Sequence, residues 1–344
     1  MKLDAPILAL ELGDVAEVAR AVEDTGVDGL FVFEGPREPF LRLALAAEHT
    51  RRATLSTQVA IALARNPMIV AQLAYDLHAF SKGRFVLGLG SQVKAHIERR
   101  FGAAWSRPTE RMHEFVRALR AIWRSWQDGT RLAFQGEFYT HTLLPPLFNP
   151  GASEFGLPKV LIAGVGPRMT EVAAELGDGM LVHPFHTRRS LESVTLPAIA
   201  RGLAAAGRTQ DELEIDVQAL IVTGRTEEDL AQARELTRQQ IGFYASTPAY
   251  RSVLEAEGAG ALQAELQALT REGRWGELGE RIDDALLDAV AIRGAPEEIP
   301  RLLVERYGSI AARVSIASPF PVHLDAIRAI AEGLRALDAT TVPR

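Results

Sequence analysis

Short apolar runs alternate with longer amphipathic segments along almost the whole sequence, and this alternation restricts the possible folds more than any other feature. Eight runs are expected to form strands: Pro6–Leu10, Gly29–Phe33, Ala53–Ala62, Arg84–Leu89, Val160–Ala163, Gly179–Val182, Ile215–Val222 and Val314–Ile316. Strands that alternate with helices over short connections predict a parallel sheet covered by helices. Eight such repeats predict a (β/α)8 TIM barrel with insertions, and a doubly wound open sheet is the alternative fold.

Helix signals fill the segments between these runs. Apolar residues recur at helical spacing in Asp14–Asp24, Pro39–His49, Pro67–Phe80, Pro108–Trp126, Arg168–Leu176, Ser190–Ala206, a segment from Glu227 onward and Leu324–Leu337. Pro67 stands in the first turn of its helix, where the missing N–H costs nothing. Arg131–His141 alternates around Gly136 and predicts a hairpin, and Asn149–Pro158 predicts a loop.

The 344 residues are expected to form a single domain, 1–344, because barrels of this length are common as one domain. The stretch around 247–299 is longer than one connection needs, so we expect a helical insertion there. We expect this insertion to lie over the mouth of the barrel, the end at which the carboxyl termini of the strands meet.

Composition excludes several classes of protein. The chain has no cysteine, so disulfides, thiolate metal sites and cysteine nucleophiles are excluded. The formal net charge of −6 argues against a nucleic-acid partner. No apolar stretch is long enough for a membrane helix, and the N-terminal run is broken by Asp4 and Glu11. We therefore expect a cytoplasmic protein with no membrane partner.

Two glycine-rich segments follow strands at the predicted mouth. Gly88–Gln92 ends the fourth strand, and Gly164, Val165 and Gly166 precede the helix after the fifth. A helix N-terminus with free N–H groups suits a phosphate, so the second loop is a candidate phosphate site. The alternative is that both segments are only tight turns that need positive φ angles.

Glu34 and His183 are the candidate catalytic residues. Glu34 follows the second strand and is a possible general acid or base, or else the partner of a nearby arginine such as Arg37 or Arg65. His183 follows the sixth strand, where it would touch a ligand or be a simple loop residue. His183 and His186 flank Pro184, which disfavours a regular helix, and no metal site is expected.

Two spaced motifs resemble the luciferase-like monooxygenase superfamily. The first consists of Arg65-Asn66-Pro67, Ser81-Lys82-Gly83-Arg84 and Leu87-Gly88-Leu89-Gly90, in that order. The second is the glycine-rich turn at 164–166, followed by a helix and by Gly177-Asp178-Gly179. The resemblance covers residues 4–335, and the form of Gly90–Gly102 is similar to the branch that uses the deazaflavin coenzyme F420.

The resemblance implies a bacterial luciferase-like barrel with a cofactor at its mouth. It implies that the phosphate lies on Gly164, Val165 and Gly166, and that Ser91, Gln92 and Val93 touch the ring or side chain of the cofactor. It also implies a bulge after the third strand, at Thr57 and Gln58, that supports the ring. In the family this bulge contains a non-prolyl cis peptide bond, and the matching bond here is Thr57–Gln58.

This sequence departs from the family pattern at two positions. Several F420-dependent dehydrogenases carry Asp-His after the second strand, where this chain has Glu34-Gly35. They also carry an acidic residue after the fourth strand, where this chain has Val93. Glu34 or His183 would therefore have to supply the proton chemistry.

The expected function is an F420-dependent oxidoreductase that transfers a hydride between the deazaflavin and a small organic substrate. One alternative is an FMN-dependent luciferase-like monooxygenase, in which the reduced flavin reacts with oxygen. Another is a non-catalytic F420-binding carrier or sensor. The resemblance further implies a homodimer, because members of the family are often dimers.

Overall fold

Eight parallel strands close into a barrel in this protein, whose computed structural model describes residues 1–9 and 11–341. The barrel strands are β1 (Lys2–Pro6), β2 (Gly29–Val32), β3 (Thr54–Thr57), β5 (Phe85–Gly90), β8 (Lys159–Gly164), β9 (Gly179–Val182), β10 (Glu214–Val222) and β12 (Arg313–Ala317). They follow one another in the order β12-β1-β2-β3-β5-β8-β9-β10, and the pairing of β9 with β10 closes the ring. The predicted (β/α)8 barrel is confirmed, and the open-sheet alternative is wrong.

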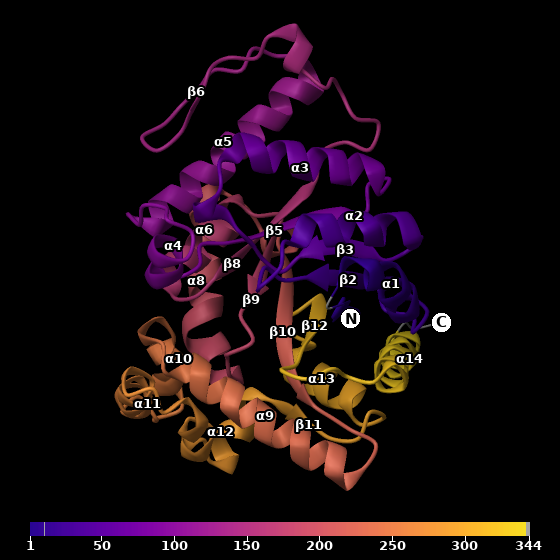
Figure 1. The fold of residues 1–344 in the computed structure, drawn as a ribbon, viewed down its shortest axis with the longest axis vertical. Coiled ribbons are helices and arrows are strands. Elements are labelled where there is room, and N and C mark those ends of the chain that lie inside the picture. The colour runs from indigo at the N-terminus through magenta and orange to yellow at the C-terminus, as the bar shows by residue number, and fades with distance from the viewer. Residues whose placement is uncertain (10, 342–344) are drawn as a thin grey trace.

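Helices surround the barrel on its outside (Figure 1). They are α1 (Val15–Glu23), α2 (Pro39–His49), α3 (Pro67–Phe80), α5 (Pro108–Asp128), α6 (Pro167–Leu176), α8 (Leu196–Ala206), α13 (Ile299–Tyr307) and α14 (Leu324–Thr341). The bounds of α3 are those predicted, because Pro67 fits its first turn and the Asn66 side chain accepts a hydrogen bond from the Met68 N–H at 2.8 Å. Of the helices in the described part of the chain, none is long and apolar enough to cross a membrane.

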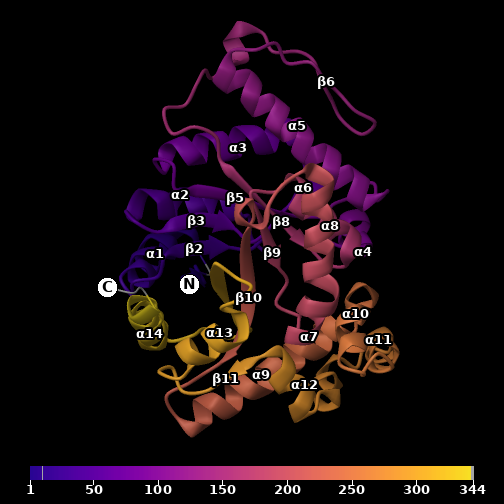
Figure 2. The same ribbon diagram turned by 180° about the vertical axis from the view of Figure 1, so that it is seen from behind.

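Two further groups of elements extend from opposite ends of the molecule (Figure 2). One is the predicted hairpin after α5, formed by β6 (Phe134–Gln135) and β7 (Thr140–His141). The other contains α9 (Glu227–Ala245), α10 (Arg251–Ala256), α11 (Leu262–Arg271) and α12 (Asp284–Val290), followed by β11 (Ile292–Arg293) beside β10. Shorter helices α4 (Lys94–Arg99) and α7 (Arg188–Ser190) follow β5 and β9. That the chain is one domain stays a prediction.

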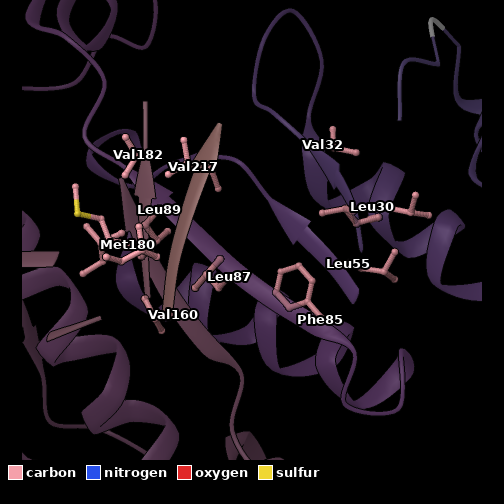
Figure 3. Close-up of a cluster of buried hydrophobic side chains, with 14 of the residues drawn as sticks. Leu30, Val32, Leu55, Phe85, Leu87, Leu89, Val160, Met180, Val182 and Val217 are labelled. Carbon is pink, nitrogen blue, oxygen red and sulfur yellow. The ribbon is translucent and has the colours of Figure 1, made fainter. Parts of the chain in front are cut away.

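The main hydrophobic core lies between the strands and the surrounding helices. Leu30, Leu55 and Phe85 lie next to one another on adjacent strands, because Leu30 is opposite Leu55 and Leu55 is opposite Phe85 (Figure 3). All three are fully buried. Burying a side chain of this size contributes roughly 1.5–3 kcal/mol relative to leaving it in water. These residues belong to the apolar runs from which the strands were predicted.

The first strand is not where the sequence predicted it. The expected strand Pro6–Leu10 shares only Pro6 with β1, and Leu10 lies outside the described residues. The strand that forms includes Asp4, although an unpaired carboxylate is unfavourable in a buried strand. Asp4 is nevertheless only 2% exposed, since its carboxylate accepts a hydrogen bond from the Arg313 guanidinium, which also donates to Glu214 at 2.8 Å. A partner 309 positions away makes the charged residue acceptable.

Candidate functional site

The carboxyl ends of neighbouring strands meet at one rim of the barrel. The register sets Val32 opposite Thr57, and it sets Gly164 opposite Val182, which in turn lies opposite Val217. The segments that follow β2, β3, β5, β8 and β9 therefore lie around the same rim. In parallel barrels the active site lies at this end.

A one-residue bulge interrupts the third strand at this rim. Ser56 is opposite Val86, and Ala60, which begins β4 (Ala60–Ile61), is opposite Leu89. The chain therefore advances four residues from Ser56 to Ala60 where β5 advances three, so one extra residue is inserted. The bulge, residues 57–59, contains a cis peptide bond between Gln58 and Val59. The predicted position, Thr57–Gln58, was therefore wrong by one bond.

Side chains explain why the chain leaves the strand only after Thr57. The Thr57 hydroxyl donates to the Gly88 carbonyl at 2.7 Å and accepts from the Gly88 N–H at 2.9 Å. It therefore makes the hydrogen bonds to Gly88 that the backbone of a neighbouring strand would otherwise make. A side chain at Gly88 would place its Cβ only 1.9 Å from the Thr57 carbonyl oxygen. Glycine is thus required opposite the bulge, which accounts for one glycine of the Leu-Gly-Leu-Gly motif.

Val59 is the residue of the bulge whose side chain stays partly exposed at the rim. A Cβ at Gly90 would lie 2.5 Å from Val59 Cγ2, so the valine occupies the space over that glycine. The backbone around it is fixed to β2, since the Gln58 N–H donates to Val32 at 2.9 Å and the Glu34 N–H donates to Val59 at 3.1 Å. Val59 was not among the residues predicted from the sequence, because the predicted cis bond lies one residue earlier.

The Gln58 side chain points away from the rim into the barrel. Its Nε2 donates to Asp216 Oδ2 at 2.9 Å and to Ser315 Oγ at 3.0 Å, while its Oε1 accepts from Gln218 Nε2 at 2.9 Å. Thr57 is fully buried and Gln58 is 5% exposed. The side chains of Thr57 and Gln58, both predicted to bind the cofactor, are therefore hydrogen-bonded inside the protein. At the rim, the bulge exposes only its backbone and the Val59 side chain.

Glu34 forms the ion pair with Arg65 that was one of the two sequence alternatives. Its Oε2 accepts from Arg65 Nη1 at 2.5 Å and from the backbone N–H of Ile61 at 2.7 Å, and the side chain is 7% exposed. The other candidate partner, Arg37, pairs with Glu11 instead. These contacts connect the loop after β2 to the segment that follows the bulge.

His183 lies directly after β9 and is enclosed by aromatic rings. The Tyr250 ring stacks on it at 4.5 Å between centroids and 23° between planes, and the Tyr244 ring meets it edge-on at 4.7 Å. Burial, and to a smaller extent the nearby His186, lowers the pKa of His183 to about 3. The imidazole is therefore neutral at physiological pH. No local pattern in the sequence signals that either tyrosine reaches this histidine.

The two predicted loops also lie at the rim. Ser91, Gln92 and Val93 are half-buried between β5 and α4, and Gln92 has a positive φ of 60°. Gly166 precedes α6 with a φ of 77°, and no side chain caps this helix. A Cβ at Gly164 would lie 3.0 Å from the Thr170 nitrogen, so the loop packs closely on the first turn of α6. Within residues 1–9 and 11–341, no group of three or more His, Asp and Glu side chains could hold a metal ion.

Known proteins resemble this chain over most of its length. An uncharacterized protein of Mycobacterium tuberculosis is 48% identical over 314 residues, which cover 91% of this chain and 92% of that protein. A 5,10-methylenetetrahydromethanopterin reductase of Archaeoglobus fulgidus is 27% identical over 306 residues, which cover 87% and 88% of the two chains.

One solved structure has the same fold from end to end. It is the coenzyme F420 dependent tetrahydromethanopterin reductase from Methanopyrus kandleri, which superposes with a TM-score of 0.79 over 98% of both chains at 20% identity. The sequence profile described as luciferase-like monooxygenase matches residues 3–313. Because that match spans nearly all of the barrel, the chain belongs to the luciferase-like monooxygenase family.

Proposed function

We propose that this protein is an F420-dependent oxidoreductase that transfers a hydride between the deazaflavin and a small organic substrate. The observation that carries the proposal is the pairing, on one rim, of the bulge at 57–59 with the uncapped glycine loop at 164–166. A Methanopyrus relative of the same fold is an F420-dependent reductase, which supports this choice of cofactor. The cytoplasmic location and the homodimer remain predictions.

The glycine loop fits the phosphate of such a cofactor. The first turn of α6 has Pro167, which has no N–H, and then the N–H groups of Arg168 and Met169, with no side-chain cap from Gly166. Uncapped N–H groups at a helix N-terminus favour an anion. Gly164, Val165 and Gly166 would hold the phosphate. Ser91, Gln92 and Val93 would touch the cofactor, and the backbone of Thr57 and Gln58 together with Val59 would support its ring.

When bound, F420 supplies two-electron hydride chemistry. The chain contributes binding, orientation and exclusion of water. Glu34 remains a candidate general acid or base, but its ion pair with Arg65 favours a positioning role, in which it fixes the loop after β2 to the bulge. His183 remains a candidate catalytic residue that would contact the substrate. It would act there as a neutral imidazole, because burial lowers its pKa to about 3.

Titration of the purified protein with F420, with FMN and with the phosphate-free deazaflavin tests this proposal. F420 should bind at least about tenfold more tightly than the phosphate-free form, a difference of about 1.4 kcal/mol, because the latter cannot use the loop at 164–166. Equal affinity for the two deazaflavins would contradict the assignment of that loop. Tight FMN binding without F420 binding would overturn the choice of cofactor.

An FMN-dependent monooxygenase is the second candidate, and membership of a family described as luciferase-like monooxygenases favours it. A non-catalytic F420 carrier or sensor is the third, and the engagement of both Glu34 and His183 in protein contacts favours it. Oxygen consumption with reduced FMN would identify the second. Tight F420 binding with no turnover of any substrate would identify the third.

Replacing Glu34 with glutamine separates its two possible roles. If the carboxylate transfers protons, Glu34→Gln should lower the rate of hydride transfer and remove a pKa from its pH profile, with an unchanged F420 affinity. If it only positions the bulge, the variant should weaken F420 binding and leave the shape of the pH profile unchanged. The matched control is Arg37→Gln, which removes only an exposed ion pair with Glu11.

A further inference from the structure

The hydrogen bonds of His183 determine which of its nitrogens carries the proton. Nδ1 lies 3.1 Å from the backbone N–H of Phe185, which can only donate, so Nδ1 is the unprotonated acceptor. In the neutral ring the proton is then on Nε2. Nε2 lies 3.2 Å from Tyr250 Oη, so His183 donates this hydrogen to the tyrosine oxygen.

Tyr250 therefore keeps its own hydroxyl hydrogen for another acceptor. A phenol has one hydrogen to donate, and here its oxygen already accepts from His183. Among residues 1–9 and 11–341, the tyrosine oxygen has no second hydrogen-bond partner. Burial raises the pKa of Tyr250 to about 12, so the hydroxyl stays protonated over the physiological range.

This hydroxyl lies at the rim on which the cofactor would bind. His183 follows Val182, which is opposite Gly164 at the end of β8. Stacking of the Tyr250 ring on His183 holds the phenol next to the first residue after β9. The surroundings are aromatic, since the Tyr244 and Phe185 rings lie 6.2 and 6.1 Å from the Tyr250 ring.

We propose that Tyr250 donates this hydrogen bond to the carbonyl oxygen of the substrate, and that the substrate is a neutral aldehyde or ketone with an apolar substituent. The proposal rests on the proposed hydride transfer. Reduced deazaflavin, when bound, would supply the hydride to the carbonyl carbon. The C=O double bond would become a single bond, and the oxygen would take the Tyr250 proton to give an alcohol. The phenolate then regains a proton from water. Because an alkoxide is a stronger base than a phenolate, this proton transfer is downhill.

The charges at the rim disfavour a cationic substrate such as an iminium ion. An iminium nitrogen has no lone pair to accept from Tyr250, and its positive charge would favour a free carboxylate nearby. The carboxylate of Glu34 is already bonded to Arg65 and to the Ile61 N–H. The neutral imidazole of His183 presents its N–H to Tyr250, so it offers no acceptor for a cation.

Tyr250→Phe tests the role of the hydroxyl, because it removes the oxygen and retains the stacked ring. The matched control is Tyr75→Phe, which removes a hydroxyl on α3 that bonds to Gln127 and to the Gly151 carbonyl. In the F420-loaded protein, with acetophenone and hexanal as probes, Tyr250→Phe should lower kcat/KM at least about tenfold, which is 1.4 kcal/mol. F420 affinity should be unchanged, and Tyr75→Phe should resemble the unmodified protein in both kcat/KM and F420 affinity.

A second readout requires neither activity nor cofactor. The carbonyl 13C resonance of labelled acetophenone should move downfield on binding to the cofactor-free protein, and Tyr250→Phe should abolish that shift. If the shift persists in Tyr250→Phe, the proposal is overturned even where F420 does not bind. Weaker F420 binding by Tyr250→Phe with unchanged kcat/KM would also overturn it, because the hydroxyl would then contact the cofactor. If the protein does not bind F420 but the carbonyl shift is seen and is lost in Tyr250→Phe, only the proposed cofactor is rejected.

Discussion

Asp216 is a carboxylic acid with no solvent contact in the middle of the barrel. Burial raises the pKa of Asp216, and the nearby Asp4 carboxylate raises it further, although Arg313 opposes both. Ser315 Oγ lies 2.9 Å from Oδ1, and Gln58 Nε2 lies 2.9 Å from Oδ2. A neutral Asp216 can donate from Oδ1 to Ser315 while Oδ2 accepts from Gln58.

Asp216→Asn should therefore leave the free energy of unfolding at pH 7 unchanged or higher. The asparagine amide can make the same two hydrogen bonds and needs no proton to remain neutral. Asp216→Leu should cost about 1–3 kcal/mol, because the buried Gln58 amide loses an acceptor. Urea denaturation of both variants measures this difference. If the asparagine variant is as unstable as the leucine variant, Asp216 is ionised in the folded protein.

At the scale of elements, one carboxylate attaches the hairpin β6–β7 to α5. Glu114 Oε1 accepts from the N–H groups of Phe138 and Tyr139 at 2.7 and 2.6 Å, and Oε2 accepts from Glu137 at 2.8 Å. A Cβ at Gly136 would lie 2.1 Å from Glu114 Oε1. The glycine around which the sequence pattern predicted the hairpin thus also makes room for this carboxylate.

Glu114→Ala should release the hairpin without unfolding the barrel. Hydrogen exchange at the amides of residues 137–139 should accelerate at least about tenfold, since hydrogen bonds to a charged acceptor contribute roughly 1.5–3 kcal/mol. The control is Glu192→Gln, which removes only an exposed ion pair with Arg188. Unchanged protection of these amides in Glu114→Ala would show that other contacts hold the hairpin.

The apolar pattern gives no sign of the bulge, which only the family resemblance predicted. The pattern predicted one continuous strand, Ala53–Ala62, whereas the structure divides it into β3 and β4 with a cis bond between Gln58 and Val59. The apolar pattern continues through the bulge, so it contains no sign of the extra residue. The pairing with β5, which changes register between Ser56 and Ala60, reveals it.

At the scale of the whole molecule, His186 connects the loop after β9 to α13. Its Nδ1 is 2.8 Å from the His183 carbonyl, and its Nε2 is 2.9 Å from Tyr307 Oη. Burial lowers the pKa of His186 to about 4 from an ordinary value of 6.5. The folded protein therefore keeps this ring neutral at pH values where the unfolded chain protonates it.

Stability should consequently fall as the pH decreases from 6.5 to 4. In that window the unfolded state binds a proton that the folded state does not, and the full shift corresponds to about 3 kcal/mol. Urea midpoints at pH 7 and pH 4.5 should differ less in His186→Gln than in the unmodified protein. His323→Gln, at an exposed position, should not change the difference. An identical pH dependence in His186→Gln would exclude this histidine as a source of the acid sensitivity.

The sequence by itself determined the number and order of the β-α units, the bounds of α3 and the rim at which the glycine loops lie. These features depend on periodicity and on residues close together in the chain, which a local pattern records. The tertiary structure alone decided the position of the first strand, which bond of the bulge is cis, which arginine pairs with Glu34, and the partners of His183 and Asp216. Each of these depends on contacts between distant residues, such as Asp4 with Arg313 or Gln58 with Asp216. A buried polar side chain is stable only with a specific partner, and the fold determines which partner comes within reach.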